Sequence, residues 1–86
     1  MKKILRKKIL FLIYDLEQLS ISGVDTKKPL QEAFEMLQIL VDEETFAAIE
    51  DMWRNRATAA DRDSLILGLM KFDREVRFLL IDKKYI

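Results

Sequence analysis

The 86-residue chain contains neither cysteine nor histidine. Without cysteine it cannot be a disulfide-stapled secreted module. The usual zinc sites need Cys or His ligands, and di-iron bundles use Glu-x-x-His pairs, so the sequence excludes both kinds of metal centre. Cysteine nucleophiles, histidine bases and Ser-His-Asp triads are excluded for the same reason. We therefore expect no enzymatic activity and no cofactor.

Glycine-rich loops and long apolar runs are also missing. Gly23 and Gly68 are isolated, so no glycine-rich phosphate loop exists. No stretch approaches the roughly 18 uninterrupted apolar residues of a membrane helix. The lysine-rich start resembles a signal peptide superficially, but the apolar run at 9–14 is short and no small-x-small cleavage site follows it. We expect a cytoplasmic protein without a membrane span, with a signal or anchor as the less favoured alternative.

The spacing of the apolar residues is helical along the whole chain. They recur at steps of three and four, and a single proline interrupts the sequence. This predicts one all-α domain over 1–86, a small antiparallel bundle of about four helices with short connections. The helices are expected at about 3–20, 29–41, 43–57 and 60–82. Their core-facing stripes are Leu5, Ile9, Leu12, Leu16 and Leu19; Leu30, Ala33, Phe34, Leu37, Leu40 and Val41; Phe46, Ile49, Trp53 and Ala57; and Leu65, Leu69, Phe72, Val76 and Leu79.

Local signals mark where these helices begin and end. Gly23 is suited to a left-handed residue after the first helix, and Pro29 is tolerated in the first turn of the second. Asp42, followed by two glutamates, predicts a new N-terminus there, although one helix over 29–57 is the alternative. Residues 58–61 have the spacing of a capping box, which would place Asp61 in the first turn of the last helix.

Charge is distributed in three blocks although the total is neutral. Residues 1–28 carry seven basic and three acidic side chains, residues 29–64 carry three and nine, and residues 65–86 carry five and three. In an up-down-up-down bundle each basic helix lies beside an acidic one. We expect the charges to pair between neighbouring helices and to disfavour wrong pairings, although each exposed pair contributes only about 0.2–1 kcal/mol.

The first and last helices carry more apolar side chains than one core stripe can absorb. Contiguous apolar patches usually mark a contact surface. One interpretation is an interface, most simply a homodimer sharing these two helices. The alternative is that the last helix is central and buried on two sides. The expected partner-binding residues are Phe11, Tyr14, Leu67, Met70, Arg74 and Phe78.

A basic cluster opens the chain, and it contains Lys2, Lys3, Arg6, Lys7 and Lys8. These five cations could bind phosphates of nucleic acid or of anionic lipid head groups. The favoured interpretation is a solvated helix end, at the unfavourable end of the helix dipole. A helix-turn-helix is disfavoured because its recognition helix would begin with Asp42-Glu43-Glu44, which DNA phosphates repel.

The remaining polar clusters favour structural interpretations. The acidic residues of 29–53 are expected to form a solvated face, since no calcium-loop spacing is present. Trp53, the only tryptophan, falls on a core stripe, with Arg54 and Arg56 near the surface. The leading hypothesis is a non-catalytic protein-protein interaction module, an inhibitor, adaptor or accessory factor. The alternatives are binding to nucleic acid or an anionic surface, and a structural subunit of a larger assembly.

Overall fold

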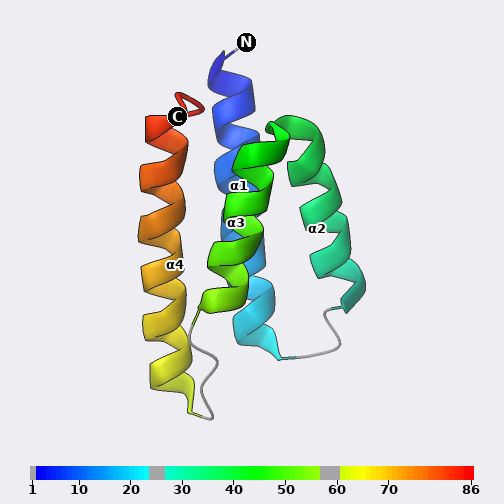
Figure 1. Ribbon diagram of the computed structural model, residues 1–86. Helices are drawn as coiled ribbons and strands as arrows, with labels where there is room; N and C mark the ends of the chain where they lie inside the picture. Colours follow the sequence, from blue (N-terminus) through cyan, green and yellow to red (C-terminus); the bar gives the residue numbers. More distant parts are fainter. Residues whose placement is uncertain (1, 24–26, 57–60) are drawn as a thin grey trace.

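The protein is an all-α four-helix bundle. The computed structural model describes residues 2–23, 27–56 and 61–86, and within these ranges no strand is present. The helices run alternately down and up in Figure 1, so that α1 contacts α2 and α4, and α3 contacts the same two. This is the predicted antiparallel bundle, with both chain ends at the same end of the molecule. The helices are α1 (Lys2–Ser22), α2 (Lys27–Leu40), α3 (Glu43–Asn55) and α4 (Arg62–Asp82).

The core lies where the four apolar faces meet. Trp53 packs edge-to-face against Phe34 and Phe72, with ring centroids 5.8 and 5.1 Å apart. Edge-to-face pairs of this kind stabilise by about 0.5–1.5 kcal/mol beyond the area they bury. The predicted core position of Trp53 is therefore confirmed. The buried apolar side chains are Ile9, Ile13, Leu16, Ala33, Leu37, Val41, Ile49, Trp53, Leu69, Phe72, Val76 and Leu80.

The expected stripes of α1 and α4 were slightly wrong in phase. Ile13 is fully buried although it lay off the predicted stripe, whereas Leu5 and Leu12 are only half-buried. On α4 the last core residue is Leu80 and not Leu79. Each of these helices touches two neighbours, so its buried face is wider than a single line of residues and centred between the two contacts.

The predicted break between α2 and α3 is present, and the alternative of one continuous helix is wrong. Asp42 is extended (φ −72°, ψ 165°), and its carboxylate accepts a 2.7 Å hydrogen bond from the Thr45 N–H. That bond satisfies one of the free donors of the first turn. It also holds the pKa of Asp42 below its usual value. Gly23 has the expected positive φ of 65° after α1.

The expected capping box before α4 is wrong in its register. Thr58, its proposed cap, lies outside the described residues. Asp61 is itself the N-cap, because its backbone is extended and its carboxylate accepts from the Ser64 N–H at 2.8 Å. Asp serves equally well as an N-cap and as a first-turn residue, so the spacing alone favoured the wrong one of two sound motifs.

The end of α4 is closed by a residue with an uncommon backbone. Lys84 has φ 65°, a conformation that usually belongs to glycine, and Tyr85 N–H then donates back to the Leu80 carbonyl at 2.8 Å. This is the six-to-one bond of a Schellman cap. The Tyr85 hydroxyl accepts from the Asp42 N–H (2.9 Å) and donates to its carboxylate (3.1 Å). The last residues therefore pack on the α2–α3 joint.

The expected pairing of charges between helices is largely wrong. In the described ranges one ion pair joins two helical segments, Lys83 with Glu44 at 3.4 Å. The others form within a helix, such as Arg77 with Asp73 at 2.8 Å. Pairs three or four residues apart lie on one helix surface, so they form at a smaller loss of side-chain freedom.

Candidate interaction surfaces

The outer face of α4 is a line of exposed apolar side chains. Four of them are between 56% and 66% exposed, although the opposite face of the same helix is core. At 100° per residue these four cluster on one side, with Arg74 in their middle. We call them the α4 stripe: Leu67, Met70, Phe78 and Ile81.

Three of the predicted partner-binding residues meet in one hollow on α4. Met70, Arg74 and Phe78 line a hollow of about 370 Å³ together with Arg77 and other α4 residues. Leu67 is exposed on the same helix, one turn below Met70. The predicted α4 half of the surface is thus a continuous helix face that combines apolar side chains with cations.

The two predicted residues on α1 do not line the α4 hollow. Phe11 and Tyr14 are exposed, as expected of surplus apolar residues. Phe11, however, lines a hollow of about 450 Å³ with Lys7, Lys8 and Met36 of α2. It therefore belongs to the α1–α2 side of the molecule, and the six predicted residues do not share one hollow.

Two exposed apolar residues on α2 were missed by the sequence analysis. Met36 and Ile39 are exposed, Ile39 at 78%. Both lie off the α2 core stripe, so the same count of surplus residues that singled out α1 and α4 would have found them.

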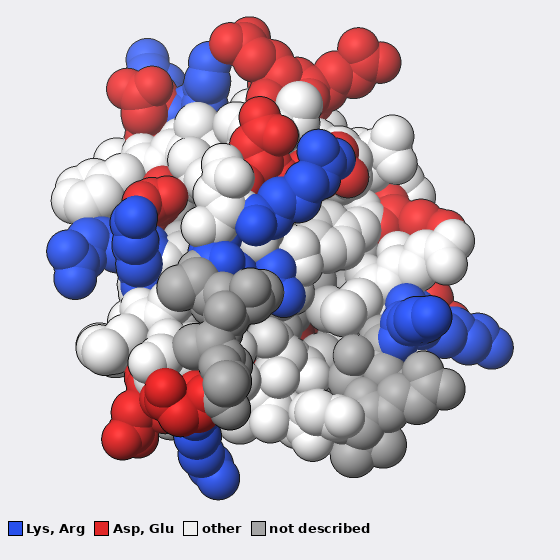
Figure 2. All heavy atoms as spheres, turned by 60° about the horizontal axis from the view of Figure 1, so that its bottom comes forward, with Lys and Arg blue, Asp and Glu red and all other residues white. Residues whose placement is uncertain are grey.

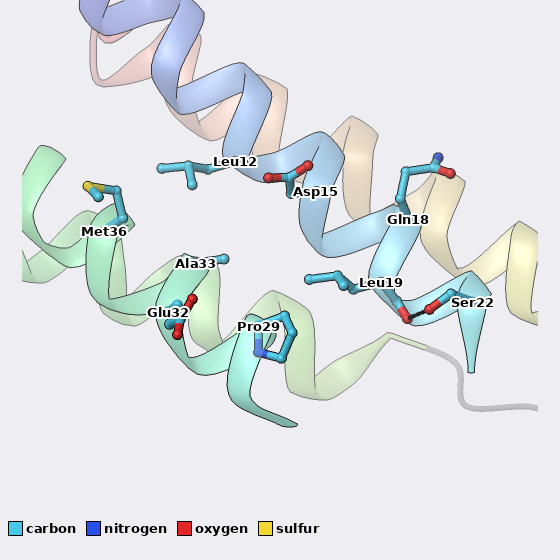
Figure 3. A pocket seen from close by; sticks show the side chains of 9 residues that line it. All are labelled: Leu12, Asp15, Gln18, Leu19, Ser22, Pro29, Glu32, Ala33 and Met36. Carbon is cyan, nitrogen blue, oxygen red and sulfur yellow. Dashed lines mark hydrogen bonds between the residues drawn. The ribbon is translucent and has the colours of Figure 1, made fainter. Parts of the chain in front are cut away.

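A wider hollow of about 640 Å³ continues the same side of the bundle. It shares Leu12 and Met36 with the hollow at Phe11, so the two hollows are parts of one α1–α2 groove. Figure 3 shows Asp15 of α1 and Glu32 of α2 on its facing walls. Among the described residues no group of three or more acidic side chains is placed to hold a metal ion.

The basic cluster gains two members from the other end of the chain. Lys3 and Arg6 line a hollow of about 510 Å³ together with Lys83 and Lys84. Lys7 and Lys8 are also exposed, on the same helix, whereas the Lys2 side chain lies outside the described part of the structure. Because the topology returns α4 to the start of α1, the cluster is larger than the sequence pattern indicated.

A carboxyl pair lies where α1 meets α4. Partial burial raises the pKa of Glu17 to about 8, together with the hydrogen bond that its protonated carboxyl donates to Asp73 and the negative charge of that residue. Arg77 lowers it only partly. The sequence analysis missed this pair, although Glu17 stands four residues after Ile13 and Asp73 four after Leu69, in line with core positions. The available signal was that each of these acids stands in line with the core residues of its helix.

Arg56 lies over the Trp53 ring, with its guanidinium carbon 3.6 Å from the ring centroid. Burial lowers the pKa of this guanidinium. Arg54 is exposed and pairs with acids of its own helix. Both arginines are thus close to the surface as expected, and Arg56 covers the indole edge of the core.

The lower end of the molecule carries charges of both signs. Figure 2 turns this end forward and shows acidic and basic side chains in small separate groups around uncharged surface.

In the described ranges no helix is long and apolar enough to cross a membrane. Comparison of the chain with protein-family models, curated proteins and solved structures found no match.

Proposed function

We propose that this protein is a non-catalytic helical module that acts in the cytoplasm by binding another protein through helices 1 and 4. The observation that supports this most is the α4 stripe, four large apolar side chains in one line on the outside of the bundle. Fully burying one such side chain contributes about 1.5–3 kcal/mol, and anchors of this kind dominate interface energies. Tyr14 and Phe11 on α1 are the further contacts.

The simplest partner is a second copy of the chain. The stripe is symmetric about Arg74, since its members stand four and seven residues away on both sides. A two-fold axis at Arg74 would set Leu67 against Ile81 and Met70 against Phe78 of the partner. It would also set Arg74 against itself. A different partner that carries a carboxylate at this point would instead complement the guanidinium.

Arg74 therefore discriminates between the two kinds of partner. In a homodimer Arg74→Ala removes a like-charge contact and tightens association. With an acidic heterologous partner the same change weakens binding. Light scattering and sedimentation equilibrium over a concentration series measure the first outcome, and binding to the captured partner measures the second.

The central test of the proposal is charge insertion in the stripe. Leu67→Asp and Phe78→Asp should abolish association while the circular dichroism spectrum stays that of the parent, because both side chains are exposed. Their urea midpoints should match that of the parent at dilutions where the parent is monomeric. Ile39→Asp on α2 is the matched control, with the same substitution at a still more exposed residue. Pull-down from the native cell, with the three variants compared, extends the test to other partners. Equal binding by all three would refute the α4 stripe as the contact surface.

A further inference from the structure

The outer side of the first half of α1 combines cations with large apolar side chains. Ile4 and Phe11 are 62% and 63% exposed, and they stand seven residues apart, so they lie on one helix face. Lys3, Lys7 and Lys8 are exposed on and beside the same face. We call this set of five residues the basic face. The first acidic residue of the chain is Asp15, beyond this face.

The fold concentrates further positive charge at this end. The first turn of α1 rises beyond the neighbouring helices (Figure 1), which leaves its sides accessible. Lys83 and Lys84 share a hollow with Lys3 and Arg6, and the positive end of the α1 dipole lies there with no acidic residue in its first turn.

Two acidic groups near this end are already engaged. Glu44 pairs with Lys83 at 3.4 Å. The Asp42 carboxylate accepts from the Thr45 N–H and from the Tyr85 hydroxyl. Both acids belong to the α2–α3 joint and not to α1, so the basic face itself stays cationic.

We propose that the basic face docks on an anionic phospholipid bilayer, with α1 lying in the interface. Lysines beside apolar anchors are the pattern of interfacial helices, in which the anchors enter the headgroup region while the cations meet lipid phosphates. Nucleic acid fits less well, because its phosphates would attract the lysines but leave Ile4 exposed to water. Among the five residues of the basic face, Phe11 alone offers a ring for stacking on a base. The α4 stripe lies on another helix, so of the residues proposed above for the protein partner the basic face shares only Phe11.

Vesicle co-sedimentation of the full chain tests this directly. The probes are vesicles of phosphatidylcholine alone and vesicles containing about one-third phosphatidylglycerol, each at low and high salt. We expect binding to the anionic vesicles that falls with salt and little binding to the neutral ones. Lys7→Glu with Lys8→Glu should weaken binding about thirtyfold or more, since each cation near the surface contributes about fivefold. Lys27→Glu with Lys28→Glu, the same change at the other end of the molecule, is the matched control and should have a much smaller effect.

The apolar anchors separate the bilayer from other polyanions. Phe11→Ser should weaken vesicle binding about fivefold or more while retention on heparin stays the same, because heparin offers no apolar phase. Leu67→Asp should leave vesicle binding intact even where it abolishes protein association. Absence of binding to anionic vesicles at low salt would overturn the proposal. So would equal losses from the two lysine pairs, or binding to DNA alone that Phe11→Ser does not change.

Discussion

At the residue scale, Glu17 is the side chain whose environment departs furthest from that of an ordinary surface acid. It lies half-buried between α1 and α4 with Asp73 beside it, so two carboxyl groups share a region that solvates only one negative charge well. Arg77 forms an ion pair with Asp73 at 2.8 Å. The result is a proton held on Glu17 around neutral pH, at a junction between two helices.

This geometry predicts a pH dependence of stability with a definite sign. The folded pKa of Glu17 is raised from 4.5 to about 8, so the folded state holds a proton that the unfolded chain releases. The stability it contributes is fully present below pH 4.5 and is lost as the pH rises through 8. Urea midpoints of the parent should therefore fall across this window. Glu17→Gln should remove the fall and exceed the parent at alkaline pH.

The control for this prediction is Glu32→Gln, which changes an exposed acid on α2. It should leave the alkaline fall of the parent in place. A Glu17→Gln profile parallel to that of the parent would show that Glu17 is not the titrating group.

At the scale of elements, the ends of the helices are defined by caps of unequal quality. Asp42 and Asp61 each accept a hydrogen bond from the residue three positions on, and both are standard N-caps. The C-terminus of α4 has Lys84 where glycine is the usual residue. A substitution of Lys84 can therefore raise the free energy of unfolding without any change in the core.

Lys84→Gly should raise the free energy of unfolding by about 0.5–1 kcal/mol. The change removes the left-handed strain of a side chain, and the greater freedom of glycine in the unfolded chain offsets part of that gain. Thermal and urea denaturation measure it. Lys83→Gly is the neighbouring control, because Lys83 has φ −83° and gains nothing from glycine. A lower urea midpoint for Lys84→Gly than for the parent would contradict the presence of backbone strain at Lys84.

The number of helices and most of their boundaries were predictable from the sequence. Particular residues show which features were not. The spacing of apolar residues and the acids after Asp42 were sufficient for four helices and the α2–α3 break. Asp61 was misplaced because two capping motifs fit one residue. The pairing of Glu17 with Asp73, and the addition of Lys83 to the basic cluster, depend on which helices become neighbours. No local pattern contains that information.

At the scale of the whole molecule, one aromatic array connects three of the four helices. Phe34 of α2, Trp53 of α3 and Phe72 of α4 form consecutive edge-to-face contacts. Phe72 is 1% exposed and is among the largest fully buried side chains of the described core. In a domain of this size the total stability is modest, at about 0.05–0.15 kcal/mol per residue.

Phe72→Ala should therefore be close to unfolding the protein. Such truncations cost about 3–5 kcal/mol, a large part of the stability available to a small domain. Circular dichroism with urea denaturation checks this. Phe78→Ala, the same change at an exposed phenylalanine six residues on, should lie within about 0.5 kcal/mol of the parent at dilutions where both are monomeric. A similar loss from both variants at such dilutions would contradict the exposed position of Phe78.

The position of the single tryptophan gives the protein its own optical reporter. Trp53 is shielded by two phenylalanine rings and capped by the Arg56 guanidinium, so its emission responds to opening of the array and to departure of that cation. Phe11 and the α4 stripe are not among the rings and the cation that contact the indole, so binding at either surface that leaves the fold intact should not disturb the signal. A spectral shift on adding vesicles or a partner would then report rearrangement inside the bundle rather than simple docking, without any attached dye.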